Sequence, residues 1–121
     1  MLDVLPPVQG IPQSEESERA VLAAVLLDPR LLAAVTGRLR AEDFFSDRHR
    51  AIFSAMIDLQ DDGSSIDLRT VQARLEQRAQ LEVVGGLTYL SGLELDLPEL
   101  GRFDDYVEIV TEPEAMDIYH V

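Results

Sequence analysis

Apolar residues recur at helical spacing through most of the chain, and no segment has the pattern of a convincing strand. The most apolar segment runs from Ala20 to Leu27 and is apolar on every side, so it predicts a central, buried helix. Ser14 is a suitable N-cap for this helix, and Asp28-Pro29 ends it. Residues 1–13 contain three prolines and a glycine without any period, which predicts an extended or disordered lead.

The remaining pattern predicts five more helices. The clearest start is Asp67, an N-cap residue flanked by Ile66 and Val71 at the spacing of a hydrophobic staple. Gly63 is available as a left-handed cap residue for the helix before it, and the pair Phe44-Phe45 is expected to pack against the apolar helix. We therefore predict an all-α fold, a compact bundle of about six helices, in which the later helices cover 29–39, 47–60, 68–78, 87–95 and 99–112.

Composition narrows the possible functions. The 121 residues suffice for one domain, with 23 acidic residues against 10 basic ones and a net charge of −13. All basic residues are arginine, so a P-loop nucleotide site and Schiff-base lysine chemistry are excluded. The acidic balance argues against direct nucleic-acid binding, and the absence of cysteine excludes disulfides and cysteine-ligated zinc. The longest apolar run, eight residues, is too short for a membrane span, and we expect a cytoplasmic protein without membrane contact.

No residue pattern indicates catalysis, cofactor binding or metal binding. His49 stands at the start of a predicted helix without a recognisable nucleophile, so we expect a surface or half-buried polar residue. The acidic segment from Asp58 to Asp67 lacks the ligand spacing of a calcium loop and is expected to be a solvated turn. We therefore predict no catalytic, cofactor-binding or metal-ligating residue.

The last predicted helix carries a candidate partner interface. Its apolar stripe is predicted either to meet a partner or to pack on the core of the domain itself. The stripe consists of Leu100, Phe103, Tyr106, Val107 and Val110. Residues 94–121 carry a net charge of −8 and the rest of the chain −5, so this end forms either a solvated face or a surface that attracts a basic partner.

Six segments, taken in order, resemble the N-terminal domain of the DnaB-type replicative DNA helicases over roughly residues 5–112. The Ser17-to-Asp28 segment is similar to the signature of that family's first helix. The other matching segments are Leu5-Pro6-Pro7, residues 42–45, 48–56, 62–71 and 81–90. Tyr106 to Val110 also matches, whereas the acidic, proline-containing residues 111–117 differ from the basic stretch that usually follows.

The resemblance implies a non-catalytic assembly and partner-docking domain. In that family the domain pairs with its neighbours in a collar of a hexameric ring, its terminal helix forms part of a helical hairpin, and its partners are primase and a helicase ATPase domain. ATP and Mg²⁺ are implied only for a full-length helicase. On this interpretation residues 14–112 are the helical domain, and 113–121 are an irregular tail or the start of a linker.

Two other functions stay open at this point. A free-standing acidic regulator would bind a basic protein surface or mimic DNA through the −8 segment. A small hydrolase would use His49 with nearby carboxylates. The main hypothesis depends instead on the ordered run of motifs.

Overall fold

A computed structural model describes residues 10–96, 98 and 100–111, and this part of the chain is entirely helical, without strands. Six α-helices and two short 3₁₀ helices follow one another, which confirms the all-α prediction. None of these helices is long and apolar enough to cross a membrane. The elements are α1 (Gly10–Leu27), α2 (Arg30–Val35), η3 (Ala41–Asp43), α3 (Asp47–Asp61), α4 (Leu68–Gln77), α5 (Gly86–Glu94), η4 (Leu100–Arg102) and α6 (Phe103–Thr111).

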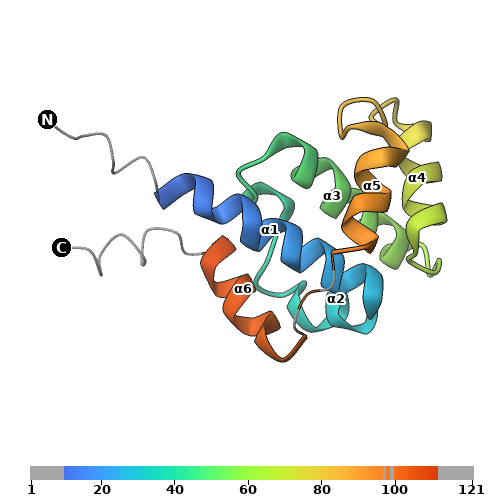
Figure 1. Cartoon of the computed structure of the whole chain (residues 1–121). Helices are drawn as coiled ribbons and strands as arrows, with labels where there is room; N and C mark the ends of the chain where they lie inside the picture. The colour runs from blue at the N-terminus through green and yellow to red at the C-terminus, as the bar shows by residue number, and fades with distance from the viewer. Residues whose placement is uncertain (1–9, 97, 99, 112–121) are drawn as a thin grey trace, which may run out of the picture.

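Helix α1 lies in the middle of the molecule, as its sequence predicts (Figure 1). It packs against α2, α3, α5 and α6, and its residues Val21, Leu22, Ala24 and Val25 are completely buried. Helix α4 lies farther out and packs on α3 and α5. A helix that is apolar all round can bury its surface only when other helices cover it on several sides.

Helix α1 begins at Gly10, four residues before the predicted start at Ser14. The prediction that residues 10–13 belong to an extended lead is therefore wrong, and residues 1–9 lie outside the described part. Pro12 is compatible with helix because it lies in the first turn, where a backbone N–H has no partner within the helix. The proline that suggested a break is therefore tolerated at this position.

Helix α2 ends at Val35, before the predicted end at Leu39. A turn that includes Gly37 follows, and the N–H of Leu39 donates to the carbonyl of Val35 at 2.8 Å. Leu39 is nonetheless completely buried, because the turn brings the chain back towards the core.

The two phenylalanines of the connector point to opposite environments. Phe44 is buried, and its ring centroid lies 4.9 Å from that of Phe53 on α3. Phe45 is 62% exposed, so the prediction that both rings pack inside is wrong for Phe45. Phe44 has an extended backbone, and neighbouring side chains along an extended segment point to opposite sides.

The start of α4 confirms the predicted cap. The side chain of Asp67 accepts a hydrogen bond from the N–H of Thr70 at 2.9 Å, and the Thr70 hydroxyl accepts the N–H of Asp67 at the same distance. Ile66 and Val71, the two staple positions, are both buried in the core.

Helices α3 and α4 end with the same backbone arrangement but different residues. Gly63 follows α3 with a φ of +75°, as predicted, and the N–H of Ser64 donates to the carbonyl of Leu59 at 2.9 Å. Ala79 takes the corresponding position after α4 with a φ of +58°. Alanine carries a steric cost in this left-handed conformation that glycine does not.

Candidate functional site

The apolar stripe of the terminal helix faces the protein's own core. Phe103, Val107 and Val110 are buried, and α6 packs along α1 (Figure 1). Their spacing of four and then three residues places them on one face of the helix. These three side chains are therefore not open to a partner, whereas Leu100 is exposed and Tyr106 is half-buried. A partner contact by Leu100 and Tyr106 stays a prediction.

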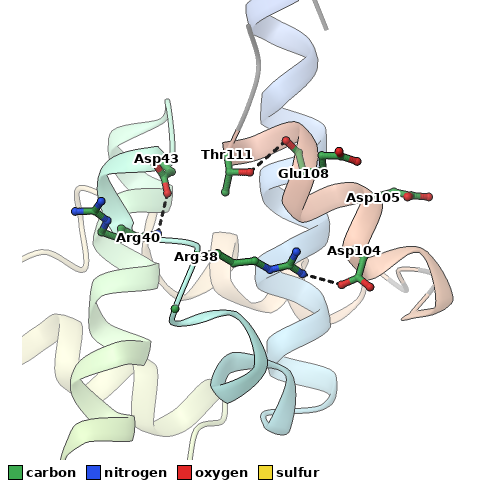
Figure 2. Close-up of a pocket in the computed structure, with 8 residues that line it drawn as sticks. Arg38, Arg40, Asp43, Asp104, Asp105, Glu108 and Thr111 are labelled. Carbon is green, nitrogen blue, oxygen red and sulfur yellow. Dashed lines mark hydrogen bonds and ion pairs between the residues drawn. The ribbon is translucent and has the colours of Figure 1, made fainter. Parts of the chain in front are cut away.

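A polar groove of about 500 Å³ separates α6 from the segment that follows α2 (Figure 2). The guanidinium of Arg38 extends across it to Asp104, with 2.8 Å between Nη2 and Oδ1. The side chain of Arg40 points away from α6 (Figure 2). The acidic face of α6 is thus partly paired within the chain. The groove is lined by Gly37, Arg38, Arg40, Asp43, Asp104, Asp105, Glu108 and Thr111.

Arginine side chains neutralise the acidic turn after α3. Arg74 on α4 lies 2.7 Å from Asp58 and 2.9 Å from Asp62, and Arg78 lies 2.6 Å from Asp58. The hydrogen bond from Arg74, with that from Arg78, lowers the pKa of Asp58 below its usual value. In the described residues no group of three or more His, Cys, Asp or Glu side chains could hold a metal ion. These carboxylates therefore join α3 to α4.

A buried polar network connects α1, α3 and α5. His49 is completely buried, so the expectation of a surface or half-buried residue is wrong. Its Nδ1 lies 2.7 Å from Oε1 of Glu18, and its Nε2 lies 2.6 Å from the hydroxyl of Tyr89. A carboxylate only accepts hydrogen bonds, so the Nδ1–H of His49 donates to Glu18. Each ring nitrogen therefore has a partner on a different helix.

The carboxylate of Glu18 also holds the start of α3. It accepts the backbone N–H of Phe45 at 2.5 Å and that of Ser46 at 3.3 Å, and Glu18 itself is 1% exposed. A carboxylate in this position replaces the partners that the first N–H groups near a helix start otherwise lack. The network thus satisfies a buried charge with three donors.

Carboxylate, imidazole and hydroxyl stand in the order found in nucleophilic catalysis. The geometry favours a structural role, because the imidazole of His49 is completely buried and both of its nitrogens are engaged. The Tyr89 hydroxyl is itself engaged by Nε2 of His49. The hypothesis of a hydrolase that uses His49 therefore has no support from this site.

Sequence reasoning missed Glu18 and Tyr89. Glu18 is the last of three glutamates before the most apolar segment, and its place at the edge of that segment is a usable signal. Gly85 is a signal for Tyr89: its φ is +103°, and an added Cβ would lie 2.9 Å from the Cβ of Tyr89. Glycine is therefore needed where the chain enters α5 close to this tyrosine.

Two arginines flank the ring of Tyr89. The guanidinium carbon of Arg48 lies 4.2 Å from the ring centroid and that of Arg19 lies 5.3 Å from it, both within cation–π range. Arg19 also forms an ion pair with Asp96 at 3.3 Å. The outer side of the buried network is therefore cationic and aromatic.

Comparison with known proteins agrees with this architecture. Residues 10–112 match the family of the DnaB-like helicase N terminal domain. The chain is similar to the replicative DNA helicase DnaB of Geobacillus stearothermophilus, with 43% identity over 105 residues that cover 87% of this chain and 23% of the relative. It is also similar to the replicative DNA helicase DnaC of Bacillus subtilis, with 38% identity over 101 residues, 84% of this chain and 22% of that protein.

A solved structure has the same fold. The crystal structure of the N-terminal domain of DnaB helicase from Mycobacterium tuberculosis matches with a TM-score of 0.75 and 35% identity, and covers 80% of this chain and 67% of that one. The chain spans less than a quarter of the length of the two helicases above. The order of motifs, the helical fold and the family match over residues 10–112 agree, and the chain belongs to the DnaB-like helicase N-terminal domain family.

Proposed function

We propose that this chain acts as the non-catalytic assembly and partner-docking domain of a replicative DNA helicase in DNA replication. The observation that carries the proposal is the match over residues 10–112 to the DnaB-like N-terminal domain, with an identity of 43% to a replicative DNA helicase. The proposed partners are other copies of the domain, primase and a helicase ATPase domain. ATP and Mg²⁺ would be bound by that ATPase domain, and the proposed location is the cytoplasm.

The chemistry of the described residues supports a role through protein contacts. His49, the residue best suited to acid–base chemistry, is buried with both ring nitrogens engaged. The groove beside α6 is lined mainly by charged side chains, unlike the mostly apolar pockets that hold cofactors. The chain also has no lysine for a phosphate-binding loop.

The test measures assembly and partner binding of the purified chain. Sedimentation velocity over a range of concentrations should show self-association, and biolayer interferometry should show binding to the primase or the helicase ATPase domain of the same organism. A chain that stays monomeric and binds neither protein would refute the proposal.

A variant that neutralises α6 separates this proposal from the alternative of an acidic regulator. The exposed carboxylates Asp104, Asp105 and Glu108 are replaced together by Asn, Asn and Gln. If helix packing governs the interface, binding should change little. If the acidic charge governs it, binding should be lost at low salt, and the regulator hypothesis would replace the present one.

A further inference from the structure

An exposed phenylalanine is bound to the buried network through its backbone. Phe45 immediately precedes the start of α3 and is 62% exposed, which is unusual for a large aromatic residue. Its backbone N–H is bound to Glu18, and Glu18 is bound to His49, which contacts Tyr89. Phe45 is therefore adjacent to the network that also positions the arginines over the Tyr89 ring.

The exposed ring is attached to a rigid support. The buried carboxylate of Glu18 accepts the N–H groups of Phe45 and Ser46, while Phe44 is anchored in the core on the other side of the chain. The backbone at Phe45 is thus held from two directions. Binding to a side chain on a held backbone costs less ordering entropy than binding to one on a mobile loop, which favours its use as an anchor.

Two arginines on the same chain segments are incompletely neutralised. Arg48 follows Phe45 by three residues, and Arg19 is next in sequence to Glu18, which binds the backbone of Phe45. No carboxylate of the described residues forms an ion pair with Arg48, whose guanidinium is held over Tyr89 at 4.2 Å. Arg19 has one carboxylate partner, Asp96, at 3.3 Å and partly exposed. In a chain with a net charge of −13, two arginines held by an aromatic ring form a local site for negative charge.

We propose that Phe45, Arg48 and Arg19 form a docking site for an acidic peptide segment that carries an apolar residue between its carboxylates. The apolar residue would pack on Phe45, and the carboxylates would bind the guanidinium groups. Charge complementarity favours a short segment over a nucleic acid, because a long polyanion would also meet exposed carboxylates such as Asp47 and Glu16. This site rests on the proposed role of the domain in partner docking.

The test uses the ¹⁵N-labelled 121-residue chain and three synthetic peptides. The probe is Asp-Glu-Phe-Glu-Asp, the uncharged control is Asn-Gln-Phe-Gln-Asn, and the third peptide has Ala in place of Phe. In ¹H–¹⁵N spectra the acidic probe should shift the amide signals of Phe45 and Ser46 and the side-chain N–H signals of Arg48 and Arg19. Both control peptides should bind about tenfold more weakly than the acidic probe, and added salt should lower the affinity of the probe.

Variants assign the binding to these side chains. Phe45→Ala and Arg48→Ala should each lower the affinity for the acidic probe by at least about fivefold. The first removes the apolar anchor, and the second removes a charged donor. Arg69→Ala is the matched control, because Arg69 is an exposed arginine on α4, outside the proposed site. Unchanged spectra away from the substitution would show that each variant is folded.

Three results would overturn the site. They are equal binding of the acidic and uncharged peptides, shifts confined to other residues, and stronger binding of an oligothymidylate than of the probe. If self-association or binding to primase or the ATPase domain persists in those cases, the proposed function stands without this site. If those assays fail while the probe binds at Phe45, the docking site stands and the helicase role falls.

Discussion

The buried network offers the sharpest test of what stabilises this domain. Replacing Glu18 with glutamine keeps the size and nearly the shape of the side chain but removes its charge. Three donors converge on this carboxylate: the backbone N–H groups of Phe45 and Ser46 and the Nδ1–H of His49. The amide oxygen of glutamine can accept two of them, while its NH₂ group faces the third and cannot accept.

The expected loss is large for a single substitution. A buried donor without a partner costs about 1–3 kcal/mol, and each hydrogen bond that changes from charged to neutral costs about 1 kcal/mol more. The sum is about 3–5 kcal/mol, similar to the cost of breaking other buried ion pairs. Small domains have a free energy of unfolding of about 5–15 kcal/mol, so Glu18→Gln, with a loss of about 3–5 kcal/mol, should remove roughly a fifth of it or more.

Urea unfolding followed by far-UV circular dichroism at neutral pH measures this loss. The control is Glu16→Gln, the same substitution two residues earlier on α1 at an exposed position, which should change the free energy of unfolding by less than about 0.5 kcal/mol. The slope of the free energy of unfolding against urea concentration should be equal in the two variants, so that their unfolding midpoints can be compared. A loss at Glu18 below about 1 kcal/mol, or no larger than at Glu16, would refute the structural role assigned to the network.

Three further predictions concern backbone strain and pH. Ala79→Gly should raise the free energy of unfolding by about 1 kcal/mol in urea unfolding, because the φ of +58° is unfavourable for alanine, and a decrease would contradict the cap assignment. Gly85→Ala should lower the melting temperature and cost about 1–3 kcal/mol of unfolding free energy, because the φ is +103° and the added Cβ would lie 2.9 Å from the Cβ of Tyr89. The control Gly92→Ala in α5, where an added Cβ meets open space, should not lower the melting temperature. The hydrogen bond from Arg74 lowers the pKa of Asp58 in the folded state, so the ionised Asp58 stabilises the fold above its unfolded pKa of about 4, and this contribution is lost as the pH falls through the folded pKa. Asp58→Asn should therefore reduce the loss of unfolding free energy below about pH 4. An unchanged dependence of the unfolding free energy on acid pH would count against this ion pair.

Local signals predicted most of the helices correctly. The cap at Asp67 and the left-handed residue Gly63 depend only on neighbouring backbone groups, and both are where the sequence predicts them. The errors are at ends where the local signal is ambiguous: Pro12 is compatible both with an extended lead and with a first helical turn. Helix boundaries are uncertain for this reason, while the existence of each helix follows from several turns of apolar spacing.

The candidate site was less predictable, because its residues come from distant parts of the chain. Glu18 and Tyr89 are 71 positions apart and meet through His49 only after α1, α3 and α5 pack together. A sequence pattern shows that a residue is polar, but the choice between solvent and a buried partner depends on what the other helices place beside it. The same holds for Phe45, whose exposure follows from the burial of Phe44.

The all-helical class and the acidic balance can be read from the residues alone, because apolar periodicity, capping residues and charge are local properties. The resemblance to the DnaB-like N-terminal family can also be read from them, through the order of the matching segments. The packing of the α6 stripe mainly on α1 and the burial of His49 between Glu18 and Tyr89 follow from how the helices come together in three dimensions. Both outcomes depend on long-range packing. An apolar helix face can have the same composition whether it belongs to a core or to an interface, and the apolar surface that the fold places beside it covers it. In this molecule α1 provides that surface.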